Sequence, residues 1–87
     1  MDNSVFVVQD FGKILFSFGK IMDEKQINRN QLATRAGIRF EVANRFYNGN
    51  IERLDIDVLA KVCFVLDCNV ADVISFQPPV SDHKENQ

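Results

Sequence analysis

The stretch Gln31-Leu-Ala-Thr-Arg-Ala-Gly37-Ile-Arg-Phe-Glu-Val-Ala-Asn-Arg-Phe-Tyr-Asn-Gly49 decides the fold. Its first part has the apolar spacing of a short helix, and Gly37 stands where that helix ends, because the left-handed conformation past a helix terminus favours glycine. A second helical pattern begins almost at once, over about 39–47. Its inward positions are Val42, Ala43 and Phe46. Two helices joined by so tight a turn predict a helix-turn-helix over about residues 29–48.

Helical patterns also lie on both sides of this stretch. Asn28 and Asp55 each precede an apolar pattern and are predicted to cap helices through their side-chain oxygens, and Asn69 is predicted to cap a short turn over Val70 to Ile74. Asp10 is predicted to cap a first helix. Its apolar side is Phe11, Ile14, Leu15, Phe18, Ile21 and Met22, with Phe16 off that row. The helix after Asp55 carries Ile56, Leu59, Val62, Cys63 and Leu66 on its inward side.

The ends of the chain have a different character. Val5 to Val8 is a β-branched and aromatic run that predicts a short strand, which could belong to a small two-stranded ribbon. Residues 78–87 are polar and are expected to form a disordered tail. We therefore expect one compact, mostly helical domain over residues 1–77.

Composition limits the class of protein. Eighty-seven residues leave room for one small core, and 46% apolar with 25% charged residues is typical of a globular chain. The longest apolar runs fall far short of the roughly 20 residues that cross a bilayer, and the N-terminus lacks the pattern of a signal peptide. We expect a soluble, cytoplasmic protein with no membrane partner.

Few residues offer catalytic or metal chemistry. Cys63 and Cys68 are too few for a disulfide framework, and the single histidine, His83, lies apart from them in the polar tail, so both are expected to be core or boundary thiols. Asp55 and Asp57 are the only closely spaced carboxylates of interest, and they suit a helix start better than catalysis. We expect no enzyme activity, no cofactor, no metal and no small-molecule ligand.

Charge is unevenly distributed along the chain. The net charge of −2 argues against binding nucleic acid through bulk positive charge. However, all five arginines lie between residues 29 and 53 with only two acids, which gives that window a charge of +3 and leaves −5 outside it. Local charge matters more than the total, because attraction to phosphate fades within a Debye length of about 10 Å.

The chain resembles the Cro/C1-type (XRE) helix-turn-helix regulators. The resemblance rests on the order and spacing of residues 28–33, 36–38 and 44–49, with 54–63 similar to the fourth helix and 67–74 to the last helix of that family. It implies an all-α, compact, five-helix, lambda-repressor-like domain. It also implies that a strand at Val5 to Val8 pairs with one at Val73 to Gln77, either within one chain or across a dimer. It further implies sequence-specific binding of double-stranded DNA, usually as a homodimer, in order to repress or activate transcription, with repression expected here.

The outward residues of the second helix are the candidate base readers. They are Arg39, Phe40, Glu41, Asn44 and Arg45. Arg45 suits a guanine edge or a phosphate, or else an ion pair with Glu41 one turn earlier. Asn44 suits adenine or a solvated surface, Glu41 suits cytosine N4 or repulsion of wrong sites, and Phe40 suits a thymine methyl or packing.

The candidate phosphate ligands flank that helix. Asn30 and Gln31 lie at the start of the preceding helix, where backbone N–H groups attract anions, and Asn50 and Arg53 follow the reading helix. Arg39 also suits phosphate, whereas Arg35 is expected on the solvated surface. The alternative function is a helix-turn-helix protein-interaction module, such as an antirepressor or antitoxin component, which would use the Val5 to Val8 edge and Phe16.

Overall fold

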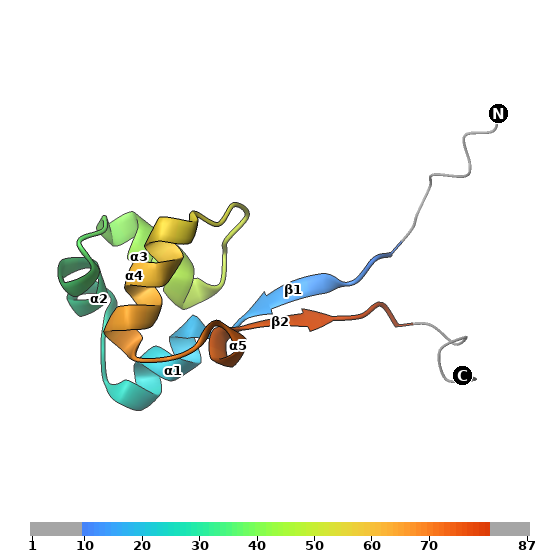
Figure 1. Cartoon of the computed structure of the whole chain (residues 1–87), viewed down its shortest axis with the longest axis horizontal. Coiled ribbons are helices and arrows are strands. Elements are labelled where there is room, and N and C mark those ends of the chain that lie inside the picture. Colours follow the sequence, from blue (N-terminus) through green and yellow to red (C-terminus); the bar gives the residue numbers. More distant parts are fainter. Residues whose placement is uncertain (1–9, 81–87) are drawn as a thin grey trace.

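Seven elements follow one another between residues 10 and 80, the part of the chain that the computed structural model describes. They are β1 (Lys13–Phe16), α1 (Phe18–Lys25), α2 (Arg29–Ala36), α3 (Phe40–Asn48), α4 (Ile56–Leu66), α5 (Val70–Val73) and β2 (Ile74–Gln77). The helices form one body, and the strands form an antiparallel ribbon that stands out from it (Figure 1). The expected five helices and small ribbon are confirmed within this part. None of these helices is long and apolar enough to cross a membrane.

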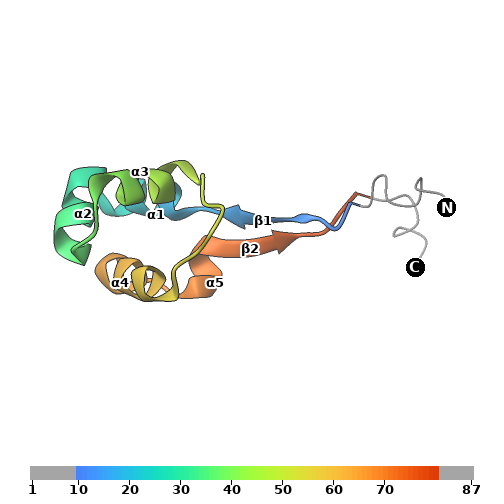
Figure 2. The same cartoon turned by 90° about the horizontal axis from the view of Figure 1, so that it is seen from above.

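The helices of the body lie in two layers (Figure 2). α1 and α3 lie on one side, α4 and α5 lie on the other, and α2 closes one end by packing against both α3 and α4. The ribbon leaves the body at the end away from α2. This arrangement gives α3 one side toward the core and one side toward solvent.

The core lies between the two layers and is entirely apolar. Within residues 10–80 the buried side chains are Phe18, Met22, Leu32, Ala33, Ala36, Ala43, Phe46, Val62, Leu66 and Val73, and no polar or charged residue is buried. Phe18 of α1 meets Phe46 of α3 edge-to-face, with ring centroids 4.8 Å apart and an interplanar angle of 73°. Aromatic pairs favour this arrangement, because the positive edge of one ring meets the negative face of the other.

The predicted helix ends are confirmed at α2 and α4. Asn28 Oδ1 accepts from the Gln31 N–H, and Gln31 Oε1 accepts from the Asn28 N–H, both at 2.8 Å, so that two free donors of α2 are bonded. Gly37 ends α2 in the left-handed region at φ 69°. Asp55 Oδ1 accepts from the Asp57 and Val58 N–H groups at the start of α4.

The two cysteines lie at the other end of α4. Cys63 and Cys68 are free and half-buried, and the Cys68 N–H donates to the Cys63 carbonyl oxygen at 3.1 Å. Burial, followed by the proximity of Cys63, raises the pKa of the Cys68 thiol to about 11. The thiol is therefore protonated at neutral pH, as expected of a cysteine whose role is packing.

The prediction of a first helix from Phe11 was wrong, because residues 13–16 form β1 and α1 begins only at Phe18. Asp10 caps no helix: its Oδ1 accepts from the Gly12 N–H, and Gly12 has φ 91°, which an α-helix does not permit. β1 pairs instead with β2, with Ile14 opposite Phe76 and Phe16 opposite Ile74.

The strand expected at the C-terminal end is confirmed as β2, although its described partner is β1 and the strand predicted over Val5 to Val8 lies outside the described residues. Phe16 is half-buried and stacks on Phe18, with ring centroids 6.2 Å apart. Of the tail predicted over residues 78–87, the part after Val80 lies outside the described residues.

Two smaller predictions about the helices need correction. Ile56 was expected on the inward side of α4 but is 78% exposed, since Val62 and Leu66 are the side chains of α4 that enter the core. α3 begins at Phe40 rather than Arg39, and Arg39 is its N-cap without a capping side-chain hydrogen bond.

α1 and α3 approach so closely at Gly19 that a Cβ atom there would lie 2.4 Å from the Tyr47 carbonyl oxygen. We expect Gly19→Ala to lower the free energy of unfolding by about 1–3 kcal/mol, because the helices must move apart. This loss runs against helix propensity, which favours alanine by about 1 kcal/mol. Urea unfolding of the variant beside Lys20→Ala, an exposed neighbour on α1, measures the effect. A Gly19→Ala protein as stable as wild type would contradict the close approach.

Candidate nucleic-acid interface

A tight junction fixes the angle between α2 and α3. After Gly37 turns the chain, the Ile38 N–H donates to the Ala33 carbonyl oxygen at 3.0 Å, and the half-buried Ile38 side chain packs against the core. α3 then begins within two residues. This is a helix-turn-helix unit whose second helix is set by backbone hydrogen bonds and packing together.

α3 has a buried side and an exposed side. Ala43 and Phe46 are buried, and Val42 packs partly against the core. The candidate base readers Arg39, Phe40, Glu41 and Arg45 are exposed, whereas Asn44 is half-buried. Three of the five candidates therefore lie exposed on α3, and Arg39 lies exposed at its N-cap.

Arg29, the first residue of α2, lies against α3. Its Nη1 donates to Asn44 Oδ1 at 2.6 Å, and its guanidinium lies 5.3 Å from the centroid of the Tyr47 ring and 5.9 Å from that of Phe40. Both distances are within the range of cation–π attraction. Arg29 therefore joins three side chains of α3 to the start of α2.

Tyr47 extends this cluster to α1. Its hydroxyl donates to both carboxylate oxygens of Asp23, at 3.0 and 3.1 Å. The hydrogen bond and the negative charge of Asp23 raise the pKa of the Tyr47 hydroxyl, and the nearby Arg29 opposes that shift. A chain of polar contacts thus links α1, α2 and α3 around the outside of the core.

The contact with Arg29 limits what Asn44 can do. Pairing with adenine uses both the oxygen and the nitrogen of an asparagine amide, and the oxygen of Asn44 already accepts from Arg29. Phe40 is affected less, because the residue remains 46% exposed beside Arg29.

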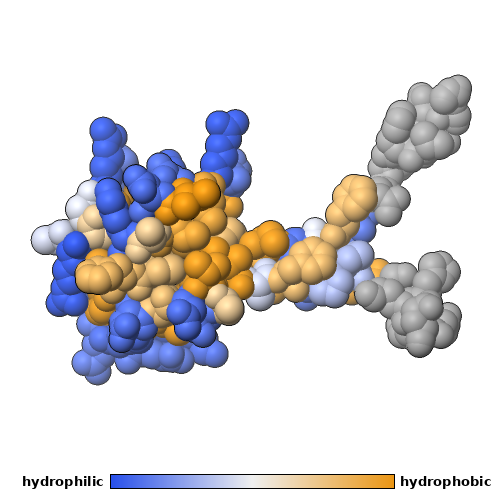
Figure 3. Space-filling model, viewed as in Figure 1, coloured by the Kyte–Doolittle hydropathy of each residue, from blue (hydrophilic) through white to orange (hydrophobic). Residues whose placement is uncertain are grey.

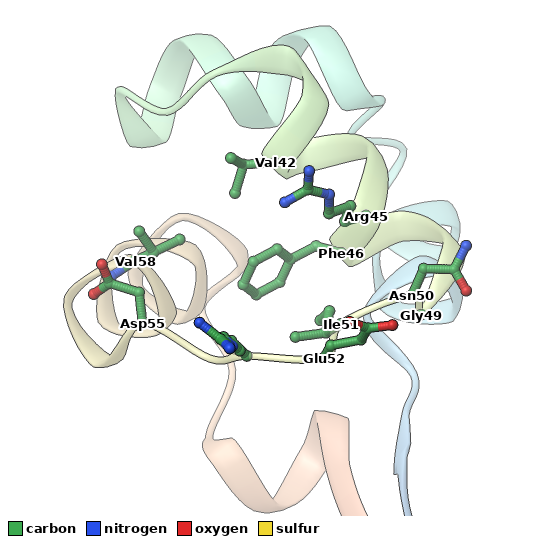
Figure 4. Close-up of a pocket in the computed structure, with 10 residues that line it drawn as sticks. Val42, Arg45, Phe46, Gly49, Asn50, Ile51, Glu52, Asp55 and Val58 are labelled. Atoms are coloured by element: carbon green, nitrogen blue, oxygen red, sulfur yellow. The ribbon is translucent and has the colours of Figure 1, made fainter.

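A hollow of about 760 Å³ lies between α3, the segment after it and the start of α4. Its apolar lining is Val42, Phe46, Ile51 and Val58, and its polar lining includes Arg45, Asn50 and Arg53. Figure 4 shows the Phe46 ring at the centre of the hollow, with Arg45 and Val42 on one side of it and Ile51 and Glu52 on the other. The fold thus brings a candidate base reader and two candidate phosphate ligands around one depression.

The other phosphate candidates lie apart from this hollow, at the start of α2. Asn30 is exposed and Gln31 is half-buried, and the side-chain oxygen of Gln31 accepts from the Asn28 N–H in the capping box. The amide nitrogen of Gln31 points to no partner in that box and keeps its capacity to donate.

Sequence reasoning missed Arg29, Tyr47 and Asp23 as a unit. Arg29 and Asn44 lie 15 residues apart and Tyr47 and Asp23 lie 24 apart, on different helices. No local pattern connects them. The usable signal was an arginine at the first position of α2, where the helix dipole disfavours a cation and a compensating partner is needed.

The comparisons with known proteins agree with this geometry. The Cro/C1-type HTH DNA-binding domain matches residues 18–79, which is more than half of the chain. The chain belongs to this family. The matched region includes α1 to α5 and β2, and therefore the whole of the α2–α3 unit.

The solved structures of similar fold include the following two. One is a candidate DNA-binding protein from Bacteroides fragilis, with 22% identity and a TM-score of 0.63, covering 72% of this chain and 100% of its own. The other is the transcriptional regulator VanUg, with 16% identity and a TM-score of 0.62, covering 91% of this chain and 100% of its own. At these identities the likeness concerns the fold. No curated protein matches the chain.

The Tyr47 cluster of this Cro/C1-type domain is open to a direct test, because the chain has one tyrosine and no tryptophan. We expect Asp23→Asn to lower the pKa of Tyr47 and Arg29→Ala to raise it, since the two charges act in opposite directions. A spectrophotometric pH titration of tyrosinate formation gives both values.

The linkage between pKa and stability provides a second readout. A folded-state pKa above the ordinary value means that the Tyr47–Asp23 contact stabilises the fold below about pH 10 and that this contribution is lost as the pH rises through the folded pKa. Equal tyrosine pKa values in wild type and both variants would show that the cluster does not form.

Proposed function

We propose that this Cro/C1-type domain is a sequence-specific transcriptional regulator that inserts α3 into the DNA major groove. The observation that carries the proposal is the division of α3 into two sides: Phe46 and Ala43 hold one side in the core, while Glu41 and Arg45 lie free on the other. An α-helix of about 10–12 Å diameter matches a groove about 12 Å wide.

Within the groove, each exposed residue of α3 has a distinct partner. Arg45 donates to guanine O6 and N7, Glu41 accepts from cytosine N4, and Phe40 contacts a thymine methyl group. Asn44 serves first as a positioning residue, because its oxygen holds Arg29, and it reads adenine only when that bond opens.

Phosphate contacts on both sides of α3 set its register on the duplex. Asn30 and Gln31 at the start of α2 meet one backbone, assisted by the helix dipole. Asn50 and Arg53, beside the hollow, meet the other, and Arg39 bridges to phosphate from the N-cap of α3.

Charge supports this orientation. All five arginines are exposed and belong to residues 29–53, whereas the rest of the chain is net acidic. The acidic remainder is repelled by DNA, so that the basic window approaches first.

We propose repression as the outcome, since occupation of a site that overlaps a promoter is sufficient to exclude polymerase. Two copies on a two-fold symmetric site would follow the usual geometry of helix-turn-helix proteins, with half-sites one helical turn apart.

Selection of bound duplexes from a random pool tests this function. We expect one enriched motif, and a palindrome with half-sites about 34–36 Å apart if two copies bind together. Recovery of no motif at low salt would reject sequence-specific binding and would favour the protein-interaction alternative.

Arg45→Ala, measured by titration of the selected duplex, should cost about 1–3 kcal/mol of binding free energy and relax the preference for guanine at one position. Lys20→Ala is the matched control, because it also removes one exposed cation but lies on α1 and lines neither hollow. Equal losses of binding free energy in the two variants, or an unchanged base preference in Arg45→Ala, would show that Arg45 does not contact a base.

A further inference from the structure

The outer face of α4 carries an apolar row that residues 10–80 leave exposed. Ile56, Ala60 and Phe64 are spaced by four residues and therefore form one ridge along the helix. All three are exposed, Ile56 by 78% and Phe64 by 85%. Figure 3 shows apolar surface over α4, bordered by hydrophilic residues. A helix that is apolar on its solvent side as well as its core side is typical of one with a partner.

Charged residues lie along one flank of this row. Asp57 and Lys61 are exposed on α4 beside it. Next to its C-terminal half, a hollow of about 400 Å³ between α2 and α4 is lined by Arg35, Ala36, Ala60, Lys61, Phe64 and Val65. The lining of this hollow is apolar with two cations and no acid, so it suits an apolar side chain that lies next to a carboxylate.

The N-terminal half of the same row supplies that pair, since Ile56 is apolar and Asp57 is the acid beside it. We propose that α4 is a self-association surface on which a second copy of this chain packs its own α4 in antiparallel orientation. The occupant of the hollow is then Ile56 of the second copy.

The spacing of the row makes the two copies complementary. With Ala60 at the two-fold axis, Ile56 of each copy lies against Phe64 of the other, and the small side chain of Ala60 allows the helices to approach closely. In an antiparallel pair the charged flanks of the two copies lie on the same side. Asp57 of one copy therefore lies beside Lys61 and Arg35 of the other, and opposite charges meet. In a parallel arrangement Asp57 of one copy and Lys61 of the other would lie on opposite flanks of the helix pair and could not meet, so that arrangement is disfavoured.

Antiparallel pairing also determines where the proposed DNA surfaces lie. Asp55 and Val58, at the N-terminal end of α4, line the same hollow as Arg45. Reversal of α4 in the second copy therefore sets the two hollows at opposite ends of the helix pair. If the proposed function holds, the pair joins two separate DNA segments and is not the pair that occupies one palindrome.

Sedimentation equilibrium of the full chain without DNA tests the interface, so its failure is distinct from a failure of DNA binding. We expect a monomer–dimer equilibrium that dissociates on dilution, and we expect Phe64→Ala to weaken it at least about tenfold. Phe76→Ala is the matched control, because Phe76 is 59% exposed on the ribbon, away from α4. A wild-type chain that stays monomeric at the highest concentration reached would overturn the proposal, as would a dimer lost in Phe76→Ala but kept in Phe64→Ala.

A charge exchange separates a specific interface from a folding defect. Asp57→Lys and Lys61→Asp each place like charges across the two-fold axis, so each variant alone should associate at least about tenfold more weakly than wild type. Mixing the two variants restores opposite charges at both contacts, and we expect heterodimers to form in the mixture. Failure of the mixture to associate more tightly than either variant alone would overturn the antiparallel arrangement.

Discussion

The contact between Phe18 and Phe46 sets the position of α3 relative to the rest of the structure. Phe46 is the one large side chain of α3 that is buried, and its ring contacts the ring of Phe18 in the first turn of α1. The adjacent Ser17 N–H donates to the Val73 carbonyl oxygen at 2.8 Å, where α5 passes into β2. The aromatic contact joins α3 to α1, the Ser17 hydrogen bond joins α1 to the base of the ribbon, and Gly19 permits the close approach of α1 and α3.

Arg29 adds a second, polar constraint on the outside of the same helix. It holds Asn44 directly and lies over Phe40 and Tyr47, while Tyr47 bonds to Asp23. Preorganised side chains lose less entropy on binding, so the cluster favours a surface whose geometry is set before DNA arrives. Arg45 and Glu41 remain outside the cluster. We therefore expect specificity to depend most on these two free residues and positioning to depend on the held ones.

Local signals predicted the parts of the fold that local chemistry determines. Asn28 and Asp55 were recognisable as caps and Gly37 as a helix terminus, because each acts within a few residues of itself. β1 was mistaken for helix, because the apolar residues from Phe11 to Phe18 satisfy a helical spacing and the strand exists only through pairing with β2, sixty residues later. The exposed residues of α3 followed from the motif, but the bond that occupies Asn44 did not, since it depends on the angle between two helices.

The central claim is that the α2–α3 unit of this Cro/C1-type domain, and no other face, receives DNA. Amide chemical shifts recorded by NMR during titration with the selected duplex test it most directly, because every described element reports at once. The account predicts that the largest changes fall on the N-terminus of α2, on the exposed side of α3 and on residues 50–53, with the ribbon and the C-terminal half of α4 nearly unchanged. Largest changes on the ribbon or on α4, or no changes at low salt, would contradict it.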